Sequence, residues 1–404
     1  MKCKDKKMAN TLIVAALGAP PVLYAPAILL GNLLRKFPPN SYHILMGHLN
    51  KIWVPKDMNS QLPAEYTYTN FPMLSMSGNW FRKTYIMMKI ISAIIEITIK
   101  GLIIIRKEGI NSIFVVQDHY VELAAILMKW ITKKKVVLWL TDLYCVPELV
   151  NVLWNQKLNG ILEPWLLKAV DKVLVCNEAT QKYYLDKYGI KTEVIHHSVE
   201  IEKYKNIEIL NKHNDQIEIA FTGSFTKSQE GGLLDLVKIV NENPDLNVKL
   251  TLYTNERLGY LKKCGVVGPN IKCGIANRKD IPSIQQSADI LFLPLTFATQ
   301  GYDHHSIVRT ASPSKLTEYL AAGVPILIYA PDYSYYVTYA KQEGFGLVVE
   351  KLDRELLLKG LRELINNSEL RTRLVTNAQR VAREYHDSNK ISLYLQKILG
   401  VNQI

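Results

Sequence analysis

Short apolar runs alternate with amphipathic segments along the first half of the chain. These runs are rich in β-branched residues and almost continuously apolar, a pattern typical of strands that are buried on both faces. They occupy residues 12–17, 113–116, 136–140 and 173–175. Helical patterns fill the intervals, at residues 26–36, about 81–107, 121–131 and 160–169. Buried strands that alternate with helices predict a parallel sheet with helices on both faces.

The same pattern restarts in the second half. Its apolar runs lie at residues 217–222, 248–253, 290–293, 325–329 and 346–349, again with helical segments between them. A chain of 404 residues exceeds the usual size of a single core. Its 48% hydrophobic and 21% charged residues are typical of globular proteins. We predict an α/β protein with one parallel-sheet domain over residues 1–205 and a second over residues 206–385.

The N-terminal segment has some features of a signal peptide or a membrane anchor. Four lysines (Lys2, Lys4, Lys6 and Lys7) precede an apolar stretch over residues 11–31. However, a Gly-Ala-Pro-Pro turn at residues 18–21 and Pro26 interrupt that stretch. A strand, a turn and a helix explain it better than a spanning helix. The five cysteines are scattered and include no Cys-x-x-Cys pair, which is typical of thiols in a reducing cytoplasm.

Positive charge is concentrated in the first third of the chain. Residues 1–135 hold 18 Lys and Arg against 7 Asp and Glu, a net charge of +11 out of +12 for the whole protein. Such an asymmetry predicts a surface that faces an anionic partner, either phospholipid or nucleic acid. We expect no nucleic-acid partner, because the sequence carries no recognised nucleic-acid-binding motif.

The segment 79–109 favours phospholipid. On a helical wheel its charged residues Arg82, Lys89, Glu96, Lys100 and Lys107 fall within about 40° of one another, and most other positions are apolar. A helix that packs on a sheet needs only about 100° or somewhat more of apolar surface, and this segment has far more. Two interpretations stay open: a crossover helix packed between neighbours with one solvent stripe, or a helix seated in the interface of an anionic bilayer.

Residues 312–325, with the sequence SPSKLTEYLAAGVP, form the most informative local motif. Pro313 suits the first turn of a helix, Ser312 or Ser314 can cap it, and Gly323 ends it. The start of such a helix presents unpaired N–H groups and a positive dipole end to a phosphate, and Lys315 adds a full charge. Glu318 lies one turn later on the same side, where its carboxylate could accept hydrogen bonds from ribose hydroxyls. Phosphate beside ribose indicates a nucleotide site.

This motif resembles the donor-binding helix of GT-B-fold glycosyltransferases, in particular those of glycosyltransferase family 4. The resemblance implies two Rossmann-like parallel-sheet domains that face each other across a cleft, and a C-terminal helix over residues 386–404 that crosses back to the first domain. It also implies transfer of a sugar from a nucleotide diphosphate sugar to a lipid-linked or saccharide acceptor, with retention of anomeric configuration. The first domain would bind the acceptor and the membrane, and the second would bind the donor. The setting would be cell-surface polysaccharide biosynthesis, in the cytoplasm on the inner face of the cell membrane.

The expected donor site lies at the carboxyl ends of the strands in the second domain, where open parallel sheets bind ligands. By resemblance, Lys315 and the Ser314 backbone would hold the diphosphate, Glu318 would hold the ribose, and Ser312 and Leu316 would belong to the same helix start. A glycine turn follows the strand 217–222, and Gly223, Ser224 and Lys227 would approach the diphosphate from it. Many family members carry a glutamate eight residues before the second one, but this chain has Thr310 there. Arg309 is the nearest substitute.

In the first domain, polar residues follow three strands. The turn with Gly18 and Pro20 follows the opening strand, at the place where the family has a glycine-rich loop near the reaction centre. Asp118 and His119 follow the strand 113–116, and Asp142 follows the strand 136–140. By resemblance, His119 would contact the donor sugar. These three side chains could orient an acceptor hydroxyl or accept its proton.

We expect no metal or other cofactor. Adjacent histidines, as at His196-His197 and His304-His305, cannot both point at one ion from a regular strand, and the chain lacks the Asp-x-Asp motif of metal-dependent glycosyltransferases. Two other functions stay open. A non-catalytic GT-B subunit that supports a partner transferase would explain the missing glutamate, and a GT-B-fold nucleotide-sugar epimerase would use the same donor helix.

Overall fold

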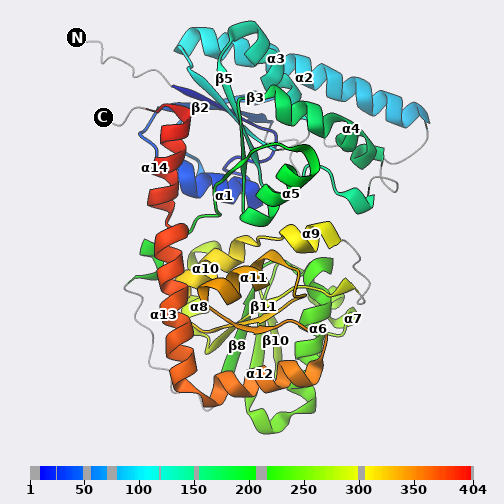
Figure 1. Cartoon of the computed structure of the whole chain (residues 1–404), viewed down its shortest axis with the longest axis vertical. Coiled ribbons are helices and arrows are strands. Elements are labelled where there is room, and N and C mark those ends of the chain that lie inside the picture. The colour runs from blue at the N-terminus through cyan, green and yellow to red at the C-terminus, as the bar shows by residue number, and fades with distance from the viewer. Residues whose placement is uncertain are drawn as a thin grey trace. The chain divides into compact units, whose positions relative to one another are not determined.

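The computed structural model describes residues 10–23, 25–48, 56–70, 80–117, 120–149, 154–205, 216–298 and 305–401. The chain forms two compact units (Figure 1). Unit 1 comprises Met1–Ser198 together with Ser388–Ile404, and unit 2 comprises Val199–Asp387. The sequence analysis placed the corresponding boundaries after residues 205 and 385.

Unit 1 is built on a parallel sheet of seven strands in the order β3-β2-β1-β4-β5-β6-β7. The strands β1 to β3 run outward on one side of β1, and the chain then crosses back to place β4 on the other side of β1 and continues outward to β7. This is the Rossmann arrangement. The strands are β1 (Thr11–Ala15), β2 (Tyr42–Gly47), β3 (Glu65–Thr69), β4 (Ser112–Val116), β5 (Lys135–Leu140), β6 (Lys172–Val175) and β7 (Glu193–Val194).

Helices cover both faces of this sheet, as the nearly continuous apolar strands predict. Alternate residues of β1 show the two faces, since Leu12 and Val14 lie in one core cluster and Ile13 and Ala15 in the other. The first core is shared by α2 (Trp80–Glu108), α3 (Val121–Thr132), α4 (Trp154–Ala169) and α5 (Glu178–Tyr188). The second is shared by α1 (Ala25–Leu34) and α14 (Ser388–Leu399).

The C-terminal helix α14 is tied into unit 1 by hydrogen bonds as well as by apolar packing. The Ser392 hydroxyl donates to the Leu33 carbonyl of α1 at 3.0 Å. The Ser112 hydroxyl of β4 donates to the Leu399 carbonyl at 2.8 Å, and the Lys135 ammonium of β5 donates to the Ile398 carbonyl at 2.8 Å. A segment from the end of the chain therefore completes the core that the first residues begin.

Unit 2 repeats the Rossmann arrangement with six parallel strands in the order β10-β9-β8-β11-β12-β13. The strands are β8 (Ile217–Thr222), β9 (Val248–Tyr253), β10 (Ile271–Gly274), β11 (Ile290–Pro294), β12 (Ile326–Tyr329) and β13 (Leu347–Val349). The helices are α6 (Lys227–Glu242), α7 (Leu258–Lys263), α8 (Ile281–Ser287), α9 (His305–Thr310), α10 (Ser314–Ala322), α11 (Tyr335–Glu343), α12 (Arg354–Asn366) and α13 (Ser368–Tyr385). The predicted fold class, two Rossmann-like α/β domains, is confirmed.

The N-terminal apolar stretch forms β1, a turn and α1, in agreement with the sequence analysis. Within the described part of the chain, no helix combines the length and the apolar character needed to cross a bilayer.

Candidate functional site

The donor-site candidates of unit 2 gather at the carboxyl end of β8, where α10 begins. Gly223 directly follows β8 and has a φ of +131°, in the region that favours glycine. A Cβ atom at this position would lie only 3.0 Å from both Cε and Nζ of Lys315. The β8 loop therefore passes directly over the Lys315 side chain, and its positive φ favours glycine at this position.

Lys315 is a buried cation with few protein partners. Its Nζ donates to Oε1 of Gln229 at 2.9 Å and lies 4.0 Å from the ring centroid of Phe221. Burial lowers the pKa of Lys315 to about 7, and the nearby Glu318 carboxylate only partly opposes this. An anion bound beside Nζ would favour the charged ammonium, so the position is suited to a phosphate.

Glu318 lies one helical turn further along α10, where a buried glutamine fixes it. The Gln285 side chain is fully buried, and its Nε2 donates to Glu318 Oε2 at 3.2 Å and to the Thr222 hydroxyl at 2.9 Å. Its Oε1 accepts a hydrogen bond from the Tyr204 hydroxyl at 2.8 Å. Burial raises the pKa of Glu318, while the charge of Arg278 and the Gln285 hydrogen bond offset part of the shift. A carboxylate held in this way can accept hydrogen bonds from a diol.

The start of α10 differs from the prediction in its cap. Pro313 has an extended backbone (φ −65°, ψ 133°) and occupies the N-cap position, not the first turn. Proline has no side chain that could form a capping hydrogen bond. The predicted cap by Ser312 or Ser314 is therefore not present, because Pro313 takes the N-cap position instead. Apart from the Leu316 N–H, which donates to the Pro313 carbonyl at 2.9 Å, the first N–H groups of α10 are left for another acceptor. The helix is also fixed to the sheet, because the Thr222 backbone N–H donates to the buried Tyr319 hydroxyl at 2.9 Å.

The remaining donor candidates have less constrained positions. Lys227 begins α6, and its exposed ammonium pairs with Glu230 at 2.6 Å. Ser224 and Arg309 are exposed, and Leu316 is buried in the core. Thr310 replaces the family's glutamate, and its hydroxyl donates to the Ser306 carbonyl within α9 at 2.9 Å. This hydroxyl therefore serves the helix itself.

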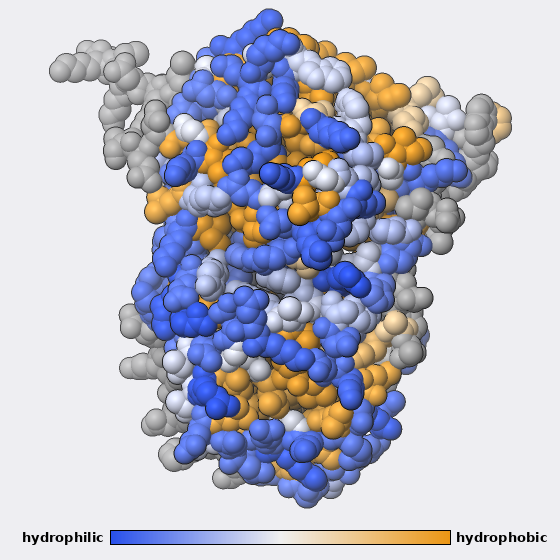
Figure 2. Space-filling view, in the orientation of Figure 1, coloured by the Kyte–Doolittle hydropathy of each residue, from blue (hydrophilic) through white to orange (hydrophobic). Residues whose placement is uncertain are grey.

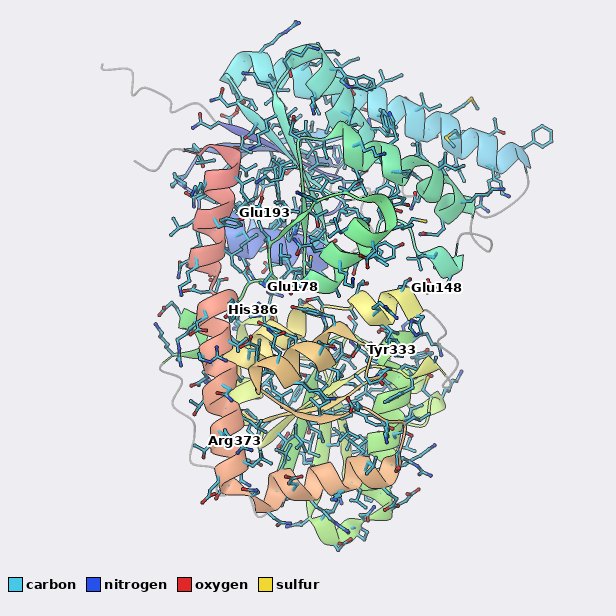
Figure 3. All side chains as sticks on the ribbon, in the orientation of Figure 1. Glu148, Glu178, Glu193, Tyr333, Arg373 and His386 are labelled. Carbon is cyan, nitrogen blue, oxygen red and sulfur yellow. The ribbon has the colours of Figure 1, made fainter. Side chains whose placement is uncertain are left out.

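The ring of His305 stacks on a tyrosine ring. Its ring lies 3.9 Å from that of Tyr333, with an interplanar angle of 9°; Tyr333 is labelled in Figure 3. His304 lies outside the described residues. In unit 1, His196 contacts Glu178 at 3.2 Å, and the neighbouring His197 is buried.

One histidine-carboxylate group of the described residues has a geometry that could hold a metal: His43, Glu65 and Glu108. Its imidazole already has partners, since Nδ1 lies 2.8 Å from Glu108 and Nε2 lies 2.8 Å from the Thr67 hydroxyl. His43 and Glu65 pair with each other near the beginning of β2 and β3. The group therefore lies at the amino end of the sheet, whereas the candidate residues lie at the carboxyl end.

In unit 1, the candidate loops follow β1, β4 and β5, which are neighbours in the sheet. Gly18 is buried, and a Cβ atom there would lie 2.9 Å from Cγ1 of Val116 at the end of β4. Pro20 packs against α1, where a Cβ atom at Gly31 would lie 2.9 Å from its ring. Asp118 and His119 lie outside the described residues, so the structure describes neither side chain.

Asp142 is the described acidic candidate at this edge. Its side chain is accessible to solvent, yet the protein around it desolvates the carboxyl and raises its pKa to about 6. At neutral pH most of the population is therefore ionised and able to accept a proton.

A buried glutamate that the sequence analysis did not single out holds the loop after Asp142. Glu163 of α4 is fully buried and accepts hydrogen bonds from the Cys145 backbone N–H at 3.1 Å and from Lys187 at 3.0 Å. The hydroxyl of Tyr184 also donates to Glu163, at 3.2 Å, and accepts from the Tyr144 backbone N–H at 3.0 Å. No local sequence signal distinguishes Glu163 from other helical glutamates, and only the fold shows its role.

One family model and many solved structures match the chain. Residues 202–381 match the family model described as glycosyl transferases group 1. No curated protein matches the sequence significantly. Sucrose-phosphate synthase from Thermosynechococcus elongatus is 14% identical, with 96% of this chain and 98% of that chain covered and a TM-score of 0.68.

Two further structures are similar to the same extent. HepE from Anabaena, solved in complex with UDP, is 12% identical over 97% of this chain and 100% of that chain, with a TM-score of 0.69. A UDP-forming α,α-trehalose-phosphate synthase from Burkholderia xenovorans is 11% identical over 98% of this chain and 99% of that chain, with a TM-score of 0.68. At such identities the likeness shows the fold. The predicted resemblance to GT-B-fold glycosyltransferases is confirmed, and nothing in these matches singles out family 4.

Proposed function

We propose, from a group 1 glycosyltransferase match in unit 2 and a GT-B fold, that this protein transfers a sugar from a nucleotide diphosphate sugar to a lipid-linked or saccharide acceptor. The observation that carries the proposal is the pair Lys315 and Glu318 at the start of α10. One is a buried cation beside uncapped helix N–H groups, and the other is a half-buried carboxylate one turn away.

The two side chains match two parts of a nucleotide. Lys315 and the first N–H groups of α10 would hold the diphosphate, and Gly223 would let the β8 loop approach it closely. Glu318, fixed by Gln285, would accept hydrogen bonds from the ribose hydroxyls. Lys227 and Ser224 would contact the diphosphate from the β8 loop, and Arg309 would contact the sugar. HepE was solved with UDP and with UDP-glucose, so uridine nucleotides are the first donors to test.

The departing diphosphate gains negative charge as the glycosidic bond to it breaks. Lys315 and the α10 dipole lie where they can stabilise that charge, so we propose that the reaction needs no metal ion or other cofactor. Asp142, with a pKa of about 6, is ionised at neutral pH and could accept the proton of an acceptor hydroxyl or orient it. Asp118, together with the turn at Gly18 and Pro20, would complete the acceptor side, and His119 would contact the donor sugar.

Three finer points rest on the resemblance to family 4: retention of anomeric configuration, a role in cell-surface polysaccharide biosynthesis, and a peripheral location on the cytoplasmic face of the cell membrane. The net charge of +11 over residues 1–135 supports an anionic membrane as partner.

Thermal stabilisation by nucleotides and nucleotide sugars tests the donor site. A ligand that binds only the folded state raises the melting temperature as its concentration rises. We expect a shift with one nucleotide diphosphate and its sugar derivatives, and a reduced shift in Glu318→Ala. Glu218→Ala is a matched control, because Glu218 lies near the amino end of β8, away from the candidate residues at its carboxyl end, and pairs with Lys249.

Two results would count against the proposal. No stabilisation by any nucleotide would favour a non-catalytic subunit. Conversion of a nucleotide sugar in the absence of an acceptor, without release of the nucleotide diphosphate, would favour an epimerase.

A further inference from the structure

The helix α2 exposes large apolar side chains along one face. Six of them are between 50% and 75% exposed: Phe81, Met88, Ile91, Ile95, Ile99 and Ile103. They recur every three to seven residues at helical spacing and form one stripe, which we call the α2 stripe. Figure 2 shows apolar surface along the course of α2 in unit 1. A contiguous apolar stripe of this length on a helix surface is typical of an interaction site.

The opposite face of α2 is the one that holds the helix to unit 1. Ile86, Ile90, Ile97 and Ile104 are buried in the core that α2 shares with the sheet. Packing of a crossover helix on its sheet explains only this buried face. The α2 stripe points away from it, so packing within unit 1 leaves the stripe unexplained.

Neighbouring helices extend the apolar surface with two tryptophans. Figure 1 shows α3 and α4 on the same side of the sheet as α2. Trp130 of α3 and Trp165 of α4 are 51% and 42% exposed, and their rings meet edge to face at 6.0 Å. Exposed tryptophan is frequent where a protein meets the headgroup region of a bilayer, because the ring has an apolar body and a polar N–H group.

Positive charge lies beside the α2 stripe. Lys89, Arg106 and Lys107 are exposed, and the aliphatic part of Lys89 brings its ammonium 5.5 Å from the Tyr85 ring. Lys100 is engaged with Glu96 and the Tyr68 carbonyl. Lysines at the edge of an apolar stripe can bury their stems while the ammonium groups reach lipid phosphates. A second copy of this chain fits less well, because a twofold interface would bring like charges together.

We propose that the α2 stripe, together with Trp130 and Trp165, seats unit 1 in the interface of an anionic phospholipid bilayer, with α2 parallel to the membrane plane. This inference deepens the proposed function and rests on it for one point, that the acceptor is lipid-linked. Docking through α2 would hold the acceptor side of unit 1 at the membrane that carries the acceptor.

Vesicle flotation of the purified protein tests the docking directly, without donor or acceptor. One set of vesicles contains phosphatidylcholine alone, and the other contains phosphatidylcholine with phosphatidylglycerol. The test variant carries Ile95→Gln, Ile99→Gln and Ile103→Gln. The control variant carries Val267→Gln, Leu352→Gln and Leu356→Gln, which are exposed apolar positions of unit 2.

We expect the wild type and the control variant to float with the anionic vesicles, and the partition of the test variant to fall about tenfold or more. A double variant, Lys89→Glu with Lys107→Glu, should lose the preference for anionic over neutral vesicles. All variants should keep the melting temperature and its shift with nucleotide, since the altered side chains are exposed. If nucleotide did not shift the melting temperature of the wild type, the proposed donor site would be contradicted, but the vesicle result would still test the docking.

Two results would overturn the docking proposal. One is a wild type that does not bind anionic vesicles, or a test variant that binds them as well as the wild type does. The other is a concentration-dependent dimer in light scattering, lost in the test variant and accompanied by no vesicle binding. That second result would assign the α2 stripe to another copy of the chain.

Discussion

Lys315 is a buried amine whose charge costs stability in the ligand-free protein. Burial lowers its pKa to about 7, whereas in the unfolded chain the amine keeps its ordinary pKa of 10.5. The unfolded state therefore holds more protons between these two pH values, and the free energy of unfolding rises with pH across that window. The penalty of burying the charged amine is present in full below pH 7 and is gone above about pH 10.5.

Lys315→Met removes this titration. From pH 7 to pH 9, we expect the free energy of unfolding of the wild type to rise by about 2 kcal/mol more than that of the variant. Denaturant unfolding of both proteins at the two pH values measures the change. A difference between the two proteins that does not depend on pH would show that Lys315 titrates normally. The variant should also lose nucleotide stabilisation, because it has no charge for the diphosphate.

Asp142 should make kcat/KM depend on pH. Desolvation raises the pKa of its carboxyl to about 6, and only the ionised form can accept a proton. We expect kcat/KM to fall as pH drops through about 6, with loss of this limb and a reduction of about 100-fold in Asp142→Asn. Nucleotide binding should be unchanged, because Asp142 belongs to unit 1. The same acidic limb in the variant would assign the titration to another group.

At the scale of the element, the close packing of the β8 loop on α10 depends on a single glycine, Gly223. Gly223 has a φ of +131°, and its Cα atom faces the Lys315 side chain. Gly223→Ala should cost about 1–3 kcal/mol of stability from backbone strain and should also weaken nucleotide binding by displacing Lys315. Gly259→Ala is a matched control in α7, since nothing lies within 4 Å of a Cβ atom there and its φ is not positive. Chemical denaturation and nucleotide titration of both variants test this, and equal effects would contradict it.

The elements that sequence reasoning found are those with a complete local signal. The segment 312–325 carries its turn, its apolar face and its stop signal within a few residues, and α10 forms there as Ser314–Ala322. Four strands were missed: β2, β3, β7 and β10. The sequence Tyr42–Gly47 of β2 has few β-branched residues. The other three are edge strands, and none of them has the continuous apolar run of a strand buried on both faces.

The candidate site was predictable only in part, for a related reason. Lys315 and Glu318 lie on one helix, so their spacing fixes that they share a face. Gln285 and Gln229, which bind these two side chains, come from α8 and α6, and only the three-dimensional fold brings them there. Lys227 was predicted from its position after a strand, but its pairing with Glu230 could be seen only in the structure.

At the scale of the whole molecule, the first and last segments of the chain share the core of unit 1. Leu395 of α14 is fully buried in the cluster that also holds Leu30 and Leu33 of α1. Unit 2 contains the nucleotide candidates and has a core of its own. Stability of unit 1 therefore depends on residues that follow unit 2 in the sequence, whereas the nucleotide candidates of unit 2 lie outside α14.

This separation predicts different effects of one substitution on the two units. Leu395→Asp places a charge in the core of unit 1 and should destabilise that unit by about 4 kcal/mol. Leu393→Asp, on the same helix at a position that is 49% exposed, should have little effect. In calorimetry with saturating nucleotide diphosphate, we expect Leu395→Asp to lower the transition that the nucleotide does not shift and to leave the stabilised transition in place. If both transitions fell together, the two units would depend on each other for folding, and α14 would contribute to both.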